Sequence, residues 1–117
     1  MSTEPDVNIQ SPMGRKLRRT EVLFITALAP SVTTGLDDVL VVEMRDGGMG
    51  SIRFINGSDR RRSRSIAEAE YVDDDGVSVS IELNVDEKDE LFELDFWKVD
   101  FSPLRRYPTP EDLKSLK

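Results

Sequence analysis

The chain has 117 residues, 38% of them hydrophobic and 33% charged, which is enough apolar material for the core of one domain. Sixteen basic and 23 acidic residues give a formal net charge of -7, and the chain has no cysteine and no histidine. These absences exclude disulfide bonds, catalysis by cysteine or histidine, and the usual zinc ligands. No stretch approaches the roughly 20 apolar residues that a membrane-spanning helix needs, so we expect no membrane partner.

The first 14 residues contain two prolines and a glycine without apolar periodicity, which predicts a disordered tail before a single domain over residues 15–117. The basic residues that follow, together with Ala27-Leu28-Ala29, mimic a secretory signal. The apolar stretch between them is shorter than the roughly 7–15 residues of such a signal, so we expect a cytoplasmic protein. In that setting Asn56-Gly57-Ser58 is a turn and not a glycosylation site.

Residues 20–29 have the pattern of a helix, with Thr20 as the N-cap, Glu21 in the first turn and Pro30 closing it. Because apolar side chains lie on nearly all sides, we expect this helix to be mostly buried. The same apolar run, Val22 to Thr26, is also compatible with a strand.

From Val39 onward, apolar and polar residues alternate between turn sequences, which predicts an antiparallel meander. The expected strands are Val39–Arg45, Ser51–Ile55, Ile66–Val72, Val77–Val85 and Leu91–Phe101. At the C-terminus, Thr109-Pro110-Glu111-Asp112 has the composition of a helix start, and Leu113 and Leu116 would hold that helix on the body. We therefore predict an α+β fold, in which an antiparallel meander sheet of about five strands carries one N-terminal helix and a short C-terminal helix.

Three sequences between the strands look like ligand sites but are better explained as loops. Residues 71–82 match a calcium loop in part, but Tyr71 stands where the first ligand should be, so they predict a hairpin turn. Gly47-Gly48-Met49-Gly50 lacks the lysine of a phosphate-binding loop, which indicates glycines with positive φ in a hairpin loop. The arginine run in Asp59–Arg64 has no interleaved aromatic residue, so it predicts a solvated loop and no nucleic-acid partner.

Acidic residues are concentrated in the second half of the chain. Residues 65–104 contain 13 acidic and two basic residues, a net charge of -11. Strand alternation directs apolar side chains toward the core, namely Ala67, Ala69, Tyr71, Val79, Ile81, Leu83, Phe92, Leu94 and Phe96. The carboxylates that it directs outward are Glu68, Glu70, Glu82, Glu93 and Asp95. On neighbouring strands, such side chains lie about 5 Å apart.

This acidic face has three interpretations. It could be a solvated face that Arg45 or Arg53 partly neutralises. It could be a docking surface for a basic protein, because acidic patches steer basic proteins toward them. It could also bind Mg²⁺ or Mn²⁺ for phosphoester hydrolysis, although no histidine or lysine is placed to act as a base.

The last predicted strand ends in apolar residues on the same outward alternation, namely Trp97, Val99 and Phe101. An apolar run on a nominally solvated face needs a cover. We expect the C-terminal helix to provide it. The alternatives are a second copy of the chain or a partner for which Trp97 is the anchor.

Two stretches, Asp46–Phe54 (DGGMGSIRF) and Leu91–Leu104 (LFELDFWKVDFSPL), resemble the signatures of a family of small bacterial domains of unknown function. With the strand Ala67–Tyr71 between them, the resemblance covers roughly residues 15–110. The family brings no established activity or catalytic residues, so the resemblance implies a bacterial cytoplasmic setting and assigns no residue a role. In size and acidity the chain is also similar to immunity proteins that neutralise toxins.

We therefore predict a non-enzymatic protein-binding domain, an immunity or inhibitor protein that neutralises a basic toxin or nuclease through its acidic face. The predicted partner-binding residues are Glu68, Glu70, Glu82, Glu93, Asp95 and Trp97. The alternatives are a divalent-metal-dependent hydrolase that uses the same carboxylates and a homodimeric structural or regulatory module joined through Trp97, Val99 and Phe101. We predict no catalytic residue, no metal ligand and no cofactor.

Overall fold

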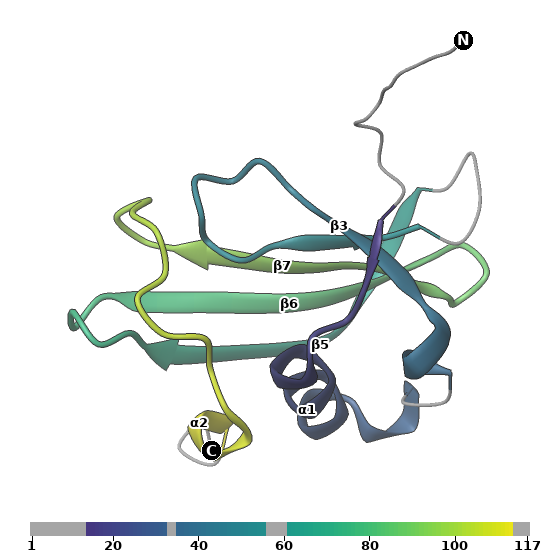
Figure 1. Cartoon of the computed structure of the whole chain (residues 1–117), viewed down its shortest axis with the longest axis horizontal. Coiled ribbons are helices and arrows are strands. Elements are labelled where there is room, and N and C mark those ends of the chain that lie inside the picture. The colour runs from purple at the N-terminus through teal and green to yellow at the C-terminus, as the bar shows by residue number, and fades with distance from the viewer. Residues whose placement is uncertain (1–13, 33–34, 56–60, 114–117) are drawn as a thin grey trace, which may run out of the picture.

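The computed structural model describes residues 14–32, 35–55 and 61–113, and in this part of the chain one antiparallel sheet carries two α-helices (Figure 1). The helices are α1 (Arg19–Leu28) and α2 (Pro110–Leu113), and two 3-10 turns are η2 (Pro30–Val32) and η3 (Leu36–Asp38). The strands are β2 (Arg15–Lys16), β3 (Leu40–Glu43), β4 (Ile52–Phe54), β5 (Arg62–Val72), β6 (Ser78–Asp86) and β7 (Leu91–Lys98). The predicted α+β class is confirmed. The expectations for the tail over residues 1–13, for Asn56-Gly57-Ser58 and for Leu116 lie outside the described residues.

The strands follow the order β2-β3-β4-β7-β6-β5, and every neighbouring pair is antiparallel. The three long strands β5, β6 and β7 form a meander, and β3 and β4 form a hairpin. The two parts join where β4 lies beside β7, with Ile52 opposite Leu94. Among the described residues the sheet has six strands, in agreement with the prediction of about five, and the β3–β4 hairpin is added at the β7 edge of the meander.

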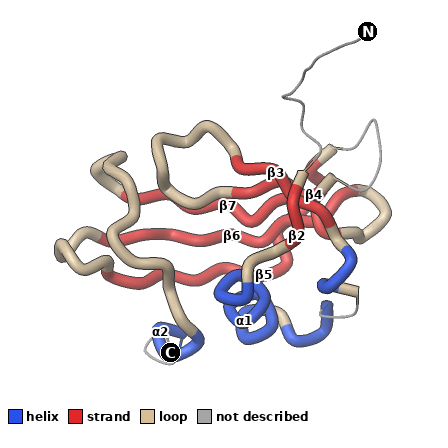
Figure 2. The backbone as a smooth tube through the Cα atoms, in the orientation of Figure 1, coloured by secondary structure: helices blue, strands red, loops and turns tan. Residues whose placement is uncertain are grey.

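Helix α1 packs on one face of this sheet (Figures 1 and 2). Phe24 and Ile25 of the helix have no exposed surface, and they join a core with alternate residues of β6 and β7. Three rings, those of Phe24, Phe96 and Tyr107, pack together with centroids 5.4–6.3 Å apart. The prediction of a helix rather than a strand is confirmed, and the C-terminal segment adds Tyr107 to the same core.

The first turn of α1 differs from the prediction. The N-cap residue is Arg18 and not Thr20, and the Arg18 backbone N donates to Glu21 Oε1 at 2.7 Å. Glu21 is 2% exposed and receives both Nη1 and Nη2 of Arg15 at 2.9 Å. This ion pair ties β2 to the helix, and it explains why an acidic side chain can be buried there. The helix is also less buried than expected, because Leu23 is 45% exposed.

Two strands have boundaries that differ from those predicted by alternation. Strand β5 starts at Arg62, inside the expected loop, because this end pairs with β6 and its arginines meet acids there: Arg62 lies 3.4 Å from Glu82 and Arg64 lies 2.6 Å from Asp89. Strand β7 ends at Lys98, since the chain turns back and the Phe101 N donates to the Lys98 carbonyl at 2.8 Å.

The C-terminal helix does not cover the apolar end of β7, so that prediction is wrong. Helix α2 contacts α1 and β5 instead. It is held there by Arg106, which pairs with Asp112 at 2.9 Å and accepts a hydrogen bond at its carbonyl from the Tyr71 hydroxyl at 2.7 Å. Trp97, Val99 and Phe101 remain exposed by 54%, 54% and 66%.

Candidate functional site

The face of the sheet opposite α1 is ordered in rows by the strand register. The first row crosses three strands as Glu68–Glu82–Asp95, and the next crosses them as Glu70–Ser80–Trp97. These residues line a shallow groove of about 620 Å³. The sequence prediction that these carboxylates share one face is borne out by the register, and we call the six predicted residues Glu68, Glu70, Glu82, Glu93, Asp95 and Trp97 the docking face.

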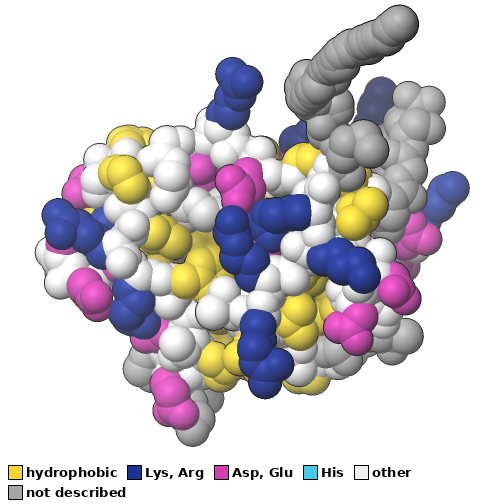
Figure 3. Space-filling view, in the orientation of Figure 1, with side chains coloured by type: hydrophobic (Ala, Val, Ile, Leu, Met, Phe, Trp, Pro, Cys, Tyr) yellow, Lys and Arg dark blue, Asp and Glu magenta, His cyan; other side chains and the backbone are white. Residues whose placement is uncertain are grey.

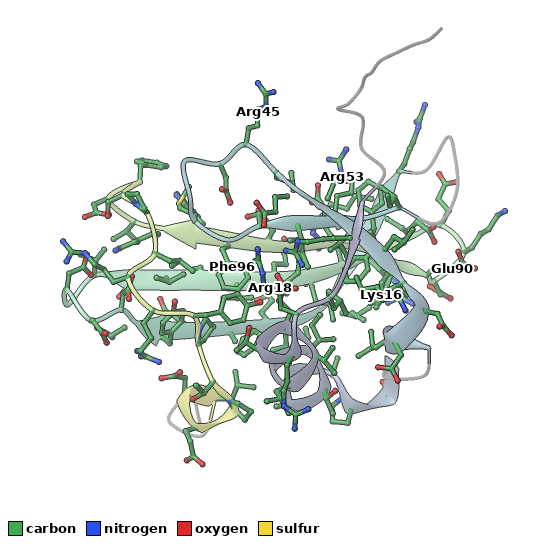
Figure 4. The ribbon with its side chains drawn as sticks, in the orientation of Figure 1. Lys16, Arg18, Arg45, Arg53, Glu90 and Phe96 are labelled. Carbon is green, nitrogen blue, oxygen red and sulfur yellow. The ribbon has the colours of Figure 1, made fainter. Side chains whose placement is uncertain are left out.

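Among the described residues, two of its five carboxylates form an ion pair. Glu93 pairs with Arg53 at 2.7 Å, and Glu82 pairs with Arg62 at 3.4 Å. Arg45, the other cation expected to neutralise this face, extends away from the sheet (Figure 4). Across the described ranges, neither Glu68 nor Glu70 has an ion pair, and both are exposed. The charge is therefore neutralised at one end of the face and left uncompensated at the other.

Asp95 lies where these carboxylates meet. Burial raises the pKa of this carboxyl, a hydrogen bond from the Ser51 hydroxyl at 3.1 Å lowers it, and the neighbouring charges of Glu93, Glu82 and Asp46 raise it further, leaving the pKa above its usual value. A raised pKa means that the ionised form is less stable in the folded protein than in water. A cation brought to this row would offset that cost.

An apolar patch adjoins the groove at its Trp97 end. Val72 lies opposite Ser78, whose carbonyl accepts the backbone N–H of Val99 at 3.1 Å, so Val72 and Val99 flank one strand. The Trp97 and Phe101 rings lie 6.3 Å apart. Phe101 has a φ of 63°, a region that L-residues other than glycine, asparagine and aspartate rarely adopt. An exposed aromatic ring held on strained backbone is the kind of feature that marks a contact surface.

Phe92 is the one predicted core residue whose surroundings differ. It is buried, but it lies outside the main cluster, with the Arg53 guanidinium 5.1 Å from the centre of its ring. The cause is a register shift in β7, where Asn84 lies opposite Glu93 and Val85 lies opposite Leu91, so Phe92 is an extra residue. Asn84, which lies on the same alternation of β6 as Glu82, is only 1% exposed.

A buried charge cluster escaped the sequence analysis. Lys98 has no exposed surface, and its Nζ donates to Asp73 Oδ2 at 2.9 Å, to Asp75 Oδ2 at 2.6 Å and to the Pro103 carbonyl at 3.0 Å. These three acceptors use all three ammonium hydrogens. The signal was present in the sequence, because Lys98 follows Leu94 and Phe96 on the inward alternation of β7.

The acidic turn that holds Lys98 is a hairpin turn, as predicted. The Asp73 N donates to the Val77 carbonyl and the Gly76 N donates to the Asp73 carbonyl, both at 2.9 Å. Burial raises the pKa of Asp73, but hydrogen bonds from the Arg105 N and from Lys98 outweigh it and bring that pKa to about 2. Burial lowers the pKa of Lys98, and the hydrogen bonds to Asp75 and Asp73 outweigh that effect, so its pKa is raised. Both groups therefore stay charged.

The glycine-rich loop is also explained by the fold. Gly47, Gly48 and Gly50 all have positive φ, as predicted. The loop packs against the C-terminal segment, where the Leu104 N donates to the Gly48 carbonyl at 3.0 Å. Within the described ranges, no group of three or more acidic side chains is arranged to hold a metal ion.

Comparison with known proteins places this arrangement in a family. The chain belongs to the family described as a domain of unknown function, DUF6984, whose model matches residues 14–108. The match contains both sequence stretches that suggested a small domain of unknown function, the docking face and the Lys98 cluster. Neither the curated proteins nor the solved structures include a match to this chain. None of the helices in the described ranges is long and apolar enough to cross a membrane.

Proposed function

We propose that this domain is a protein-binding module that docks a basic partner on the docking face. The observation that carries the proposal is the groove in which Glu68, Glu70 and Asp95 have no ion pair with any cation of the described residues, next to exposed Trp97. Other parts of the same chain neutralise their carboxylates, as at Asp73 and Asp75. A face that keeps its charge uncompensated is complementary to lysine or arginine side chains of a partner.

The order of the rows indicates what such a partner presents. The carboxylate row gives way to a mixed row and then to the exposed side chains of Val72 and Val99. A matching surface carries basic side chains at one end and apolar side chains at the other. Trp97 lines the groove and contacts Phe101, which makes it the natural anchor, since tryptophan is enriched among residues that dominate binding energy.

The particular function that we propose is that of an inhibitor or immunity protein, which neutralises a basic toxin or nuclease in the bacterial cytoplasm. A small acidic domain with a net charge of -7 suits this role, because opposite net charge speeds the encounter with a basic target. No catalytic step is required of any residue on this face.

The test is an affinity capture from bacterial lysate at low salt with three baits. The wild type is compared with Glu68→Lys/Glu70→Lys, and the control is Glu87→Lys/Glu90→Lys, which makes the same charge change at exposed residues of the β6–β7 turn. We expect a basic protein that binds the wild type and the control, is lost by the first variant and is released by salt. Equal retention by all three baits, or equal loss from both variants, would contradict the proposal.

The exposed apolar patch favours a second candidate, a homodimer joined through Trp97, Val99 and Phe101. Sedimentation of the wild type beside Trp97→Ser at high micromolar concentration tests it. A dimer that the substitution disrupts supports this candidate, and a monomeric wild type removes it.

A further inference from the structure

Strand β5 forms one edge of the sheet, because β6 is its only neighbour among the described strands (Figure 2). With 11 residues it is also the longest of these strands. An edge strand presents backbone N–H and C=O groups on its outer side, and a further strand can pair with them. This edge borders the docking face, since Glu68 and Glu70 belong to both.

The pairing with β6 fixes which backbone groups of β5 point outward. Along an antiparallel pair, residues that bond to the neighbouring strand alternate with residues whose N–H and C=O point away from it. The Asp73 N donates to the Val77 carbonyl, and the Val99 N donates to the Ser78 carbonyl. The even-numbered residues of β6 that follow Ser78 therefore bond toward β7, and the odd-numbered residues bond toward β5.

Two glutamates of β5 lie opposite even-numbered residues of β6. Glu68 is opposite Glu82, and Glu70 is opposite Ser80. The backbone N–H and C=O groups of Glu68 and Glu70 therefore point away from β6, toward the outer side of the sheet. No hydrogen bond from a loop or side chain of the described ranges reaches these groups. They are free to pair with another chain.

The free part of the edge is short and has defined ends. At one end, the carbonyl of Val72 accepts Arg106 Nη2 at 3.4 Å, which agrees with the outward direction of the even-numbered residues. At the other end, the pairing with β6 shifts register between Ser65 and Ala67. Residues 67–71 lie between these points, so an occupant is an extended segment of about five residues.

The outer side of this stretch is open to the groove of the docking face. Ala69 packs its side chain on the core, in the row of Ile81, and yet it lines the groove. It can line the groove only through its backbone, which therefore lies at the rim. Glu68 and Glu70 are exposed, and Ala67 and Ala69 are partly exposed although α1 packs on their side of the sheet.

Charge selects what can pair with this edge. Antiparallel pairing of two copies about Ala69 would place Glu68 of one copy opposite Glu70 of the other, and like charges directly opposite each other are destabilising. A strand with lysine or arginine at these positions reverses the sign of the interaction. Its alternate side chains would lie on the α1 side, where Figure 3 shows Lys and Arg side chains gathered at the middle, so apolar residues suit them better than further basic ones.

We propose that β5 accepts an extended segment of the basic partner as an added strand, with lysine or arginine side chains opposite Glu68 and Glu70 and apolar side chains on the α1 side. This inference rests on the proposed function, because it says how the basic partner is held on the docking face. It can fail while the proposed function stands, since a helix or a folded surface can also bring basic side chains to the same groove.

The experiment titrates the ¹⁵N-labelled full chain with a capped peptide of sequence Lys-Val-Lys-Val-Lys. The control is the same peptide with N-methyl groups on its three central backbone nitrogens, which keeps every charge and removes the donors that strand pairing needs. We expect the parent peptide, at saturation, to slow hydrogen exchange of the Glu68 and Glu70 amides about tenfold. We expect the N-methylated peptide to bind about tenfold more weakly, without this protection.

The outcomes separate the two proposals. Equal binding of both peptides without protection at Glu68 and Glu70 would overturn the added strand and leave the proposed function standing. No binding of either peptide at millimolar concentration would also overturn the added strand, while the capture from lysate decides the proposed function. Protection of these amides in the protein alone at high micromolar concentration would show that a second copy occupies the edge.

Glu70→Pro and Glu70→Gln are a matched pair of variants. Both remove the carboxylate, and only proline also removes the outward N–H. This N–H takes no part in the pairing with β6, and edge strands tolerate proline where its nitrogen faces solvent. We expect Glu70→Pro to bind the parent peptide about tenfold more weakly than Glu70→Gln. Equal affinities would overturn the added strand, and the N-methylated peptide decides the matter if the proline variant does not fold.

Discussion

Two acidic regions of this molecule, both drawn from residues 65–104, use their carboxylates in opposite ways. In the β5–β6 turn, Asp73 and Asp75 hold the buried ammonium of Lys98. On the docking face, Glu68 and Asp95 lie one β6 residue apart in a row, and neither has a cation from the described chain. The two regions therefore differ in what their carboxylates contact: those of the first are paired with a buried ammonium, and Glu68 and Asp95 of the second have no ion pair among the described residues.

Removing Lys98 tests the first region most severely. In Lys98→Met the two aspartates remain at their sites without the ammonium, and breaking a buried ion pair from one side is strongly destabilising. We expect the melting temperature to fall by more than about 10 °C, by differential scanning calorimetry. Lys88→Met, at an exposed lysine of the β6–β7 turn, is the control and should melt close to the wild type. Equal melting temperatures of the two variants would show that the cluster is not a structural element.

Asp73→Asn has the next largest expected effect. Loss of this charge, with Asp75 still present, should lower the free energy of unfolding at pH 7 by about 3 kcal/mol in urea titrations. Asp74→Asn, at an exposed aspartate of the same turn, is the matched control.

The Asp73 carboxyl also makes the stability of the protein depend on pH. Because the pKa of Asp73 falls from 3.8 to about 2 on folding, its contribution is fully present above pH 3.8 and is lost as the pH falls toward 2. The stability difference between wild type and Asp73→Asn should therefore shrink over that interval. Carboxyl groups titrate over roughly pH 2 to 5. A stability difference that stays constant over this interval would contradict the assignment.

Gly48→Ala probes how the chain closes over the same cluster. A Cβ at Gly48 would lie 3.1 Å from Pro103 Cβ, and the Pro103 carbonyl is one of the three acceptors of Lys98. Gly76→Ala is the control, since its φ of +82° nearly equals the +85° of Gly48 and its Cβ would meet nothing within 4 Å. Strained backbone should cost both variants about 1–2 kcal/mol, and we expect Gly48→Ala to lose more. Equal losses in urea titrations would show that the loop and the C-terminal segment do not depend on this contact.

A substitution on the docking face should change the free energy of unfolding least, and it should stabilise the protein rather than destabilise it. Glu68→Gln removes one of two like charges that face each other across β5 and β6, where Glu68 lies opposite Glu82. We expect a gain of a few tenths of a kcal/mol at low salt that disappears at high salt. Glu90→Gln, in the β6–β7 turn, should show no such gain. A loss of stability in Glu68→Gln would mean that this carboxylate has a structural role.

The sequence predicts those features of the fold and of the candidate site that depend on residues close together in the chain. Alternation along a strand is local, so it correctly placed Glu82 and Asp95 on one face. The cap of α1 was missed because Glu21 is fixed by Arg15 from a separate strand, which propensities for the first turn do not include. The joining of β4 to β7 is also a long-range pairing that period-two patterns cannot specify.

The buried ion pairs of Lys98 were not predicted for a different reason. The alternation placed it inward, but a lysine is almost never fully buried without a partner. The partners were the aspartates of a turn 23–25 residues earlier, which the sequence analysis assigned to the turn alone. The exposed end at Trp97 was misjudged for a related reason: Arg106 contacts Asp112 and the Tyr71 hydroxyl, which holds α2 beside β5, and Leu113 packs against the core there.

The most direct test of the account is one substitution made at two sites, Asp73→Asn and Asp95→Asn, with the free energy of unfolding measured at pH 7 and low salt. Each change removes one negative charge and nearly preserves shape. The pKa of Asp73 is lowered by folding and that of Asp95 is raised. The account predicts that Asp73→Asn is destabilised and Asp95→Asn is slightly stabilised. Two changes of the same sign would contradict the claim that one acidic region stabilises the fold while the other is left for a partner.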